Sequence, residues 1–320
     1  MATYQNSFLI YNPFAGKLIR KRDQLLQRTI DELRSRGHQV TAIPTRGPRT
    51  AADLARECVD QGADLILAAG GDGTINEVLN GIVHSDVPLA IVPAGTANVL
   101  AVELGIGTQM TMAARKLEDL VPARISVGLL ENNQDRRHFI LMAGAGFDAM
   151  ILYTIDAKLK AAFGKAAYWF GGFNHFAKPL PEFDVVIDGT RSRWSFALAS
   201  RVRNYGGDLW IARGASLFSD QFELVLFEGN NSLPYVKYLI GIMANRLSTM
   251  RGVSVTKAES IVLECSSDPG IYVQIDGEHA GRLPARLSIV PRSLTLLIPP
   301  ALMESANTAA HESASLRRHG

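Results

Sequence analysis

The sequence predicts an α/β protein with an N-terminal Rossmann-like parallel-sheet domain and a C-terminal antiparallel β-sandwich domain. The chain of 320 residues is too long for one ordinary core and suits two domains. In its first third, short apolar runs alternate with longer amphipathic ones, which is the pattern of βαβ units. Beyond about Ile125 the pattern changes to short β-rich runs bounded by Gly, Asn and Asp. We therefore expect two lobes, with the active site in the inter-domain cleft.

The first domain, residues 1–125, is predicted to alternate strands and helices along the chain. Gly37 is expected to end the first helix, because glycine is common just beyond a helix C-terminus. The predicted strands are Ser7–Tyr11, Gln39–Ile43, Asp64–Ala69 and Leu89–Val92. The predicted helices are Leu18–Arg36, Thr50–Gln61, Thr74–Val83 and a last one from about Thr96 to Leu104.

The second domain, residues 126–303, is predicted to consist mainly of strands. These are His138–Met142, Phe183–Ile187, Ser195–Ser200, Phe222–Phe227, Ile261–Cys265, Tyr272–Ile275 and Leu294–Ile298. One long helix, over Ala149–Lys178, is expected to interrupt them. The polar tail from Glu304 to Gly320 is predicted to be disordered, because it has too few apolar residues to pack.

The composition indicates a globular protein of a reducing compartment. Hydrophobic residues make up 47% of the chain and charged residues 20%, and the net charge of +2 is too small to indicate nucleic-acid binding. Cys58 and Cys265 lie far apart without metal-ligand spacing, and no signal-peptide core follows Met1. The longest weakly polar stretch, Val87–Val102, is shorter than the roughly 20 residues of a spanning helix. We expect a cytoplasmic protein without a nucleic-acid partner.

The sharpest motif is Gly70-Gly71-Asp72-Gly73-Thr74, where a buried strand gives way to a helix. Glycines let phosphate oxygens approach the backbone, and the first N–H groups of a helix favour an anion. We expect Thr74 to cap that helix. A plain glycine-rich turn is the alternative. Asp72 argues against it, because a carboxylate beside a triphosphate needs a cation such as Mg²⁺ between them.

Two further turns follow predicted strands of the same sheet. Asn12-Pro13-Phe14-Ala15-Gly16-Lys17 follows the first strand, and Pro93-Ala94-Gly95-Thr96-Ala97-Asn98 follows the fourth. Each of them alone is an ordinary turn sequence. In an open parallel sheet, ligands bind beyond the carboxyl ends of the strands, and all three motifs are expected at that edge. Together they predict a nucleotide-binding site.

These motifs together resemble the diacylglycerol kinase catalytic domain family, which includes bacterial soluble lipid kinases and sphingosine kinases and shares a superfamily with NAD kinases. The string GGDGTINEVLNG is highly specific, and NPFAGK and PAGTAN support it. The resemblance covers nearly the whole chain, because Gln274-Ile275-Asp276-Gly277-Glu278 also matches. It implies a kinase that uses ATP and Mg²⁺, with a nucleotide-binding first domain and a lipid-binding second domain.

The resemblance also implies two sets of ligand-binding residues. ATP contacts are implied for Asn12, Pro13, Phe14, Ala15, Gly16, Thr45, Gly71, Asp72, Gly73, Thr74, Ile75, Asn76, Glu77 and Thr96. In bacterial relatives a structural Mg²⁺ in the second domain is held by an Asp and nearby backbone carbonyls, which correspond here to Asp220, Leu217 and Phe222. An ordinary loop acid is the alternative for Asp220, because Ser-Asp pairs are frequent in turns.

By itself, Asp276-Gly277 between two β-rich runs is typical of a short hairpin turn. The resemblance instead implies that this segment supplies the carboxylate that accepts the proton of the lipid hydroxyl. We take Glu278 as the base and Asp276 as its close partner or alternative. Asp72 is expected to act as a third catalytic residue through Mg²⁺.

The sequence departs from the family pattern at three places. Val99 and Ser126 each stand at a position where many relatives have Asp. Both differences remove charge near the proposed metal network. Ser219-Asp220-Gln221 stands where Asp-Gly is usual, so the geometry of that loop is expected to differ.

The predicted helix Ala149–Lys178 combines apolar and aromatic residues with Lys158, Lys160 and Lys165. Such a face can lie on an anionic bilayer, although an ordinary helix packed on the sheet is the alternative. We therefore expect peripheral association with a membrane that holds the lipid substrate. A homodimer is compatible with this expectation.

The sequence thus predicts a kinase that transfers the γ-phosphate of ATP to a lipid hydroxyl. Diacylglycerol is the default acceptor, which would give phosphatidic acid. A sphingoid base or another lipid alcohol is an alternative acceptor. Two further alternatives are an NAD kinase, which shares the GGDGT string, and a nucleotide-dependent lipid-binding regulator with weakened catalysis.

Overall fold

The computed structural model describes residues 3–146, 181–205, 210–229, 237–238, 240–242, 244–265, 270–306 and 308. The chain divides into two compact units, Met1–Ile125 with Arg292–Gly320, and Ser126–Pro291. The helix expected over Ala149–Lys178, with its three lysines, lies outside the described residues. Of the helices that are described, none is both long enough and apolar enough to cross a membrane.

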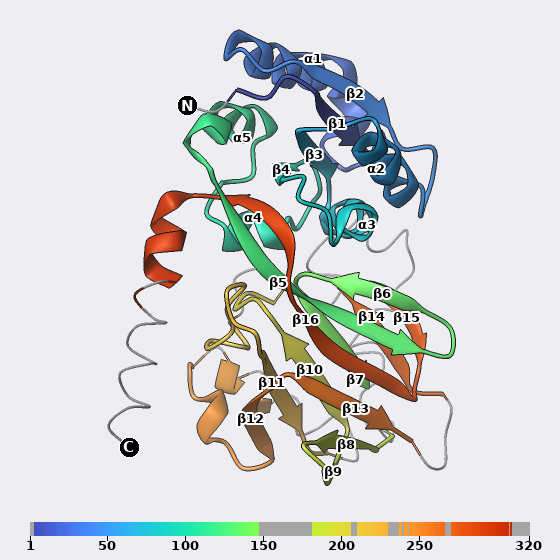
Figure 1. Cartoon of the computed structure of the whole chain (residues 1–320). Coiled ribbons are helices and arrows are strands. Elements are labelled where there is room, and N and C mark those ends of the chain that lie inside the picture. Colours follow the sequence, from blue (N-terminus) through green and yellow to red (C-terminus); the bar gives the residue numbers. More distant parts are fainter. Residues whose placement is uncertain are drawn as a thin grey trace. The chain divides into compact units, whose positions relative to one another are not determined.

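The first unit is built on a parallel sheet (Figure 1). Its strands are β1 (Ser7–Tyr11), β2 (Val40–Pro44), β3 (Leu65–Gly70), β4 (Leu89–Pro93) and the last part of β16 (Ala285–Ile298). The order is β2-β1-β3-β4, and Ser7 pairs with Val40 on one side and with Leu65 on the other. At the β4 edge, Leu296 of β16 pairs in parallel with Leu89. The predicted parallel sheet is confirmed.

Helices cover both faces of this sheet (Figure 1). They are α1 (Leu18–Ser35), α2 (Ala51–Asp60), α3 (Asp72–Ile82), α4 (Val99–Glu103), α5 (Met110–Lys116) and the 3-10 helix η1 (Leu117–Asp119). Side chains of α1 and α5 form one buried cluster with the sheet, in which Leu33 and Met110 join Leu67. α2 and α3 pack together and against β1 and β3. Gly81 permits that packing, because a Cβ there would lie 2.2 Å from the carbonyl oxygen of Ala52.

Two of these helices begin two or more residues away from the expected position. α3 begins at Asp72 with Gly71 in the N-cap position, so the prediction that Thr74 caps it was wrong. Thr74 lies in the first turn, and its side chain packs over Gly70, where a Cβ would lie 2.4 Å from the Thr74 Cβ. α4 begins at Val99 because Asn98 adopts a left-handed conformation, with φ of 49°, which interrupts the helix expected from about Thr96.

The second unit is an antiparallel β-sandwich (Figure 1). Six strands form one sheet in the order β12-β11-β10-β7-β14-β15. In the other layer β13 pairs with β8 and with the first part of β16, β8 pairs with β9, and β5 pairs with β6. The strand bounds are β5 (Val121–Asn132), β6 (Arg136–Phe139), β7 (Met142–Gly146), β8 (Phe183–Ile187), β9 (Thr190–Trp194), β10 (Phe196–Ser200), β11 (Phe222–Phe227), β12 (Val253–Ala258), β13 (Ser260–Glu264), β14 (Tyr272–Ile275) and β15 (Glu278–Arg282), with the 3-10 helix η2 (Leu247–Thr249) before β12.

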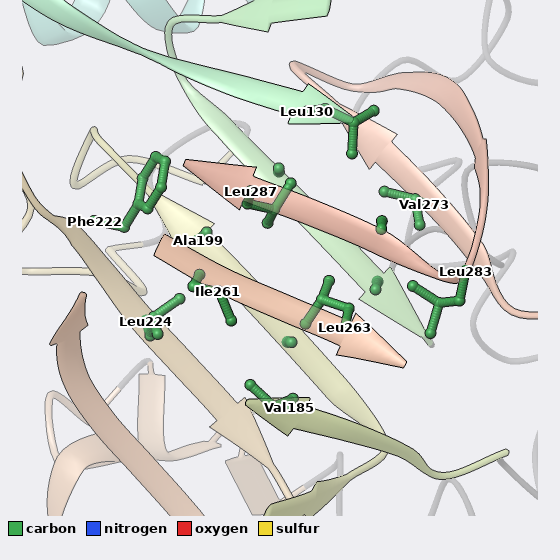
Figure 2. Close-up of a cluster of buried hydrophobic side chains, with 14 of the residues drawn as sticks. Leu130, Val185, Ala199, Phe222, Leu224, Ile261, Leu263, Val273, Leu283 and Leu287 are labelled. Carbon is green, nitrogen blue, oxygen red and sulfur yellow. The ribbon is translucent and has the colours of Figure 1, made fainter. Parts of the chain in front are cut away.

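The core of this unit is filled by side chains from both layers. Figure 2 shows Phe222 and Leu224 of β11 in one buried cluster with Ile261 and Leu263 of β13. Because successive side chains on a strand point to opposite faces, each layer contributes alternate residues to the cluster. The predicted antiparallel sandwich is confirmed.

One predicted strand of this unit proved to be two. The run His138–Met142 was expected to be continuous, but the structure divides it between β6 and β7. The break has a physical cause, because the N–H groups of Ile140 and Leu141 donate to the carboxylate of Asp276 at 3.0 and 2.9 Å. These N–H groups are therefore not available to a neighbouring strand.

The end of the chain also differs from expectation. Residues from Arg292 onward group with the first unit, because β16 continues into the parallel sheet, so the second unit ends at Pro291 rather than at residue 303. Residues 300–306 and 308 are helical, so the tail expected to be disordered from Glu304 begins within a helix. There the Ser305 hydroxyl donates to the carbonyl oxygen of Ala301 at 2.8 Å. Residue 307 and residues 309–320 lie outside the described part.

Candidate active site

The loops after β1 and β4 are joined at the carboxyl edge of the first unit's sheet. The backbone N–H of Lys17 donates to the carbonyl oxygen of Ala94 at 3.0 Å. The N–H of Asn12 donates to the carbonyl oxygen of Ala69 in β3, also at 3.0 Å. A Cβ on Gly16 would lie 3.1 Å from the Thr96 hydroxyl oxygen. The sequence prediction that these turns share one edge is therefore met by direct contacts.

The loops after β3 and β4 meet even more closely, glycine against glycine. A Cβ added to Gly95 would lie 2.4 Å from the Cα of Gly71, a distance that real Cβ atoms do not adopt. The N–H groups of Ala94 and Gly95 both donate to the carbonyl oxygen of Gly70, at 2.9 and 3.0 Å. Only glycine at position 95 allows the two backbones to approach in this way.

Asn98 fixes the shape of the second of these loops. Its side-chain oxygen accepts the N–H of Gly95 at 2.9 Å, and its amide nitrogen donates to the Gly95 carbonyl at 2.7 Å. The side chain is buried, and its backbone is left-handed, a conformation that Asn tolerates better than most residues. Sequence analysis did not select Asn98 as a site residue, although its place in PAGTAN marked it as part of a turn.

Asp72 contacts the start of α4. Its carboxylate oxygens accept the backbone N–H groups of Val99 at 3.0 Å and Leu100 at 3.2 Å, so Asp72 caps this helix from the first turn of α3. Burial raises the pKa of Asp72 above its ordinary value, against the opposing effect of these and other backbone N–H donors. Val99, which stands in the place of a family Asp, contributes its N–H to this arrangement. The proposed Mg²⁺ contact of Asp72 stays a prediction.

Thr45 and Glu77 belong to the rim of the same edge. The N–H of Thr45 donates to the carbonyl of Tyr11 at 2.8 Å, which places the loop after β2 beside the loop after β1. Both carboxylate oxygens of Glu77 accept backbone N–H groups, from Arg49 at 2.8 Å and from Ala51 at 3.0 Å. Glu77 therefore holds the start of α2.

The other predicted nucleotide-binding residues differ in their exposure. Phe14 is 77% exposed, and Thr96 is also exposed, so both side chains are accessible to a ligand. Ile75 and Asn76 are buried, so that they would contact a ligand through their backbone. Pro13, Ala15, Gly16, Gly71, Gly73 and Thr74 complete the edge, and the side-chain amide of Asn12 donates to the Thr74 hydroxyl at 3.4 Å.

This edge has the chemistry of an anion-binding site. The first N–H groups of a helix have no partner within the helix and carry the positive end of the helix dipole. α3 begins at this edge with Gly71 as its N-cap, and Gly71, Asp72 and Gly73 are each partly exposed there. A phosphate group is a suitable ligand for such an arrangement.

In the second unit, Asp276 is buried at the turn between β14 and β15. Its carboxylate accepts three backbone N–H groups, from Ile140, Leu141 and Met142, at 3.0, 2.9 and 3.0 Å. With φ of 48° at Asp276 and 80° at Gly277, the turn has the backbone of a two-residue hairpin. Because its oxygens are used in this way, Asp276 is placed to hold the β6–β7 corner.

Glu278 is accessible, in contrast to Asp276. It is the first residue of β15, and 42% of its side chain is exposed. Its carboxylate lies 3.5 Å from the guanidinium of Arg137, which also donates to the carbonyl oxygen of His279 at 3.0 Å. Arg137 was not predicted as a site residue, because nothing in the sequence relates it to the hairpin.

The residues implied to hold a structural Mg²⁺ lie close together in the sequence. The guanidinium of Arg201 binds backbone carbonyl oxygens of the same segment. Arg201, which is 0% exposed, donates to the carbonyl oxygen of Leu217 at 2.6 Å and to that of Ser219 at 3.1 Å. Asp220 accepts a hydrogen bond from the Ser126 hydroxyl. Phe222 opens β11 and stacks on Phe139. Among the described residues there is no group of three or more His, Cys, Asp or Glu side chains that could hold a metal ion.

Comparisons with known proteins agree with this architecture. The model of the family described as diacylglycerol kinase catalytic domain matches residues 6–130, and that of the YegS C-terminal NAD kinase beta sandwich-like domain matches residues 142–298. The chain is 29% identical over 277 residues to a protein of Mycobacterium tuberculosis named diacylglycerol kinase, with 84% of this chain and 88% of the relative covered. It is 28% identical over 297 residues to a protein of the same name from Bacillus subtilis, with 91% and 95% covered.

A solved structure has the same fold. The crystal structure of a diacylglycerol kinase from Bacillus anthracis superimposes with a TM-score of 0.76 at 22% identity, covering 94% of this chain and 100% of that chain. The two family models match both parts of the sequence, one after the other, and the curated relatives align over nearly their whole length. The chain therefore belongs to the diacylglycerol kinase catalytic domain family, in the form that carries a C-terminal NAD-kinase-like β-sandwich.

Proposed function

We propose that this protein transfers the γ-phosphate of ATP to the hydroxyl group of a lipid, with diacylglycerol as the acceptor. Its family and its kinase-named relatives make the chain a lipid kinase. The nucleotide and the particular lipid are the proposed parts. The single observation that supports a nucleotide most strongly is that α3 begins at the carboxyl edge of the sheet, where Gly71, Asp72 and Gly73 are partly exposed.

ATP is proposed to bind along the edge formed by the loops after β1, β2, β3 and β4. The N–H groups that open α3 would face the phosphates, while Asn12 and Thr96 would contact the nucleotide through their side chains. Mg²⁺ would arrive as part of Mg·ATP, since this ion is usually held by substrate phosphates, water and only one or two carboxylates. Its contribution would be to neutralise the charge of the phosphates.

Glu278 is proposed as the general base of the transfer. The lipid hydroxyl gives its proton to the Glu278 carboxylate, and its oxygen forms a bond to the γ-phosphorus. The bond between that phosphorus and the β,γ-bridging oxygen breaks, and ADP leaves. Exposure of Glu278 supports this choice over the buried Asp276, whose oxygens already accept three N–H groups. Asp276 is thus proposed as a positioning residue.

Because diacylglycerol resides in a bilayer, the enzyme has to reach a membrane surface. The segment Ala149–Lys178 remains the proposed contact, on the basis of its aromatic residues and of Lys158, Lys160 and Lys165. Binding to vesicles that contain an anionic lipid should then weaken with added salt and with neutralisation of the three lysines.

An acceptor panel tests this proposal. The protein is incubated with ATP and Mg²⁺ and, in separate reactions, with diacylglycerol, sphingosine, another lipid alcohol or NAD, and each product is identified by mass. NAD is included because the second domain is NAD-kinase-like. Phosphatidic acid as the main product supports the proposal. Phosphorylation of NAD alone, or of no acceptor at all, would contradict it.

A further inference from the structure

The loop 217–222 of the second unit binds the positively charged side chain of Arg201. The residues implied to bind Mg²⁺ there are the carbonyl of Leu217, the carboxylate of Asp220 and the carbonyl of Phe222. Mg²⁺ requires about six oxygen ligands at roughly 2.0–2.1 Å in near-octahedral geometry. The guanidinium of Arg201 is hydrogen-bonded to the Leu217 carbonyl at 2.6 Å. A divalent ion on the same oxygen would stand beside this positive charge, so the residues do not fit the ion.

Arg201 is built into the fold at this place. It directly follows β10, its backbone N–H donates to the carbonyl of Leu141 at 2.8 Å, and its side chain is 0% exposed. A buried charge is costly unless hydrogen bonds and an opposite charge compensate it. The carbonyls of Leu217 and Ser219 provide the hydrogen bonds.

Asp220 provides the opposite charge. Burial lowers the pKa of Arg201 to about 10, and the Asp220 carboxylate acts in the opposite direction, so the guanidinium stays charged at neutral pH. Ser126 donates its hydroxyl hydrogen to Asp220, so it adds no second negative charge. Among the described residues, the exposed Asp220 carboxylate thus balances the charge of the guanidinium one to one, which suits a monovalent group better than a divalent ion.

We propose that the guanidinium of Arg201 takes the role of a structural metal ion in the 217–222 loop. Its positive charge and its hydrogen bonds stabilise the loop, and no metal ion binds there. The same residue is tied to the hairpin with the proposed base. Its N–H binds Leu141, whose own N–H binds Asp276, so the loop, the β6–β7 corner and the Asp-Gly turn form one hydrogen-bonded chain. The proposal does not rest on the proposed reaction, because neither nucleotide nor lipid enters it.

The first test measures the melting temperature of the wild-type protein without nucleotide, in EDTA and then with Mg²⁺, Ca²⁺ or Mn²⁺. Asp220→Asn is measured in parallel. We expect wild-type shifts below about 2 °C, which is less than about 1 kcal/mol of stabilisation for a protein of this size. A larger rise that persists in Asp220→Asn comes from metal elsewhere and is consistent with the proposal. A larger rise that Asp220→Asn abolishes places a metal in this loop and overturns it.

The second test compares substitutions of the arginine. Arg201→Met keeps length but leaves the buried Leu217 carbonyl and the partly buried Ser219 carbonyl without the guanidinium donors, and we expect its melting temperature to fall by about 10 °C. Arg201→Lys keeps a charge and donors and should lose clearly less. Arg203→Met, two residues along the same segment, is the matched control; it removes a partly exposed arginine that stacks on Trp210, and it should lose clearly less than Arg201→Met. If Arg201→Met and Arg201→Lys melt alike, the charge does not hold the loop, and the proposal fails. The metal titration of wild type decides the question if Arg201→Met does not fold.

Discussion

The two acids of the β14–β15 hairpin have opposite surroundings, although they are two residues apart. Asp276 is buried and accepts three N–H groups, whereas Glu278 is partly exposed beside Arg137. A side chain that acts on a substrate must be accessible to that substrate. The Asp276 carboxylate instead uses its oxygens to hold the β6–β7 corner. The geometry thus supports the proposed roles, with Glu278 as the base and Asp276 as a positioning residue.

Exchange of Glu278 and Asp276 for their amides should separate these roles. Glu278→Gln cannot accept a proton, so we expect kcat to fall on the order of 10²–10⁴-fold while the melting temperature stays nearly unchanged. Asp276→Asn turns an NH₂ group toward backbone N–H donors, so it should lower stability by about 1–3 kcal/mol as well as turnover. The measurements are kcat at saturating lipid and thermal unfolding. Equal turnover of Glu278→Gln and wild type would remove Glu278 from the mechanism.

The raised pKa of Asp72 predicts how the stability of the protein changes with pH. Because burial raises its pKa, the folded protein binds this proton more tightly than the unfolded chain does. Its contribution to stability is therefore fully present below the ordinary value of 3.8 and declines as pH rises through the raised value. We expect Asp72→Asn, which does not titrate, to lose least relative to wild type at neutral pH and most in acid. Melting curves of both proteins over an acid-to-neutral series measure this difference. An increasing wild-type advantage with rising pH would show that the backbone N–H donors dominate instead.

At the scale of elements, the proposed nucleotide-binding edge depends on two loops whose backbones touch. Gly71 belongs to the start of α3 and Gly95 to the loop before α4. The two positions differ in the space available to a methyl group, because the nearest atom to a Cβ is 2.4 Å away at Gly95 but 3.4 Å away at Gly71. The close contact at Gly95 holds the two turns together at one edge of the sheet.

This difference gives a matched pair of variants. Gly95→Ala forces the two loops apart, and we expect it to cost about 1–3 kcal/mol of stability and to weaken ATP binding at least about tenfold. Gly71→Ala makes only an ordinary van der Waals contact and should keep the melting temperature of wild type. Unfolding curves and ATP titrations measure both effects. If the two variants have the same stability and affinity, the close contact of the loops has no role in binding.

At the scale of the whole molecule, the sequence predicted those features whose cause is local. β1, β8, β11 and β14 have the predicted bounds, because each is an apolar run between turn residues. β9 and β12 were missed because their partly exposed, polar side chains lack a clear apolar run. The glycine loops were predicted from composition and position alone. They lie together as expected.

Long-range hydrogen bonds account for what the sequence did not predict. Asp72 caps a helix that begins 27 residues later, at Val99. Arg201 binds carbonyls at Leu217 and Ser219, and no local pattern of side chains indicates such partners. The break at Ile140 depends on Asp276, 136 residues away. These contacts exist only once the sheets have assembled.

The most direct test of ATP:lipid phosphotransfer is a competition with radiolabelled γ-phosphate. The protein is given labelled ATP and Mg²⁺ with diacylglycerol in anionic vesicles, sphingosine and NAD together, and the labelled products are separated. We expect most of the label to enter phosphatidic acid, and we expect Glu278→Gln, at equal occupancy by ATP, to produce phosphatidic acid on the order of 10²–10⁴-fold more slowly. Label that remains in ATP, or that appears in inorganic phosphate or phosphorylated NAD instead of lipid, would contradict it.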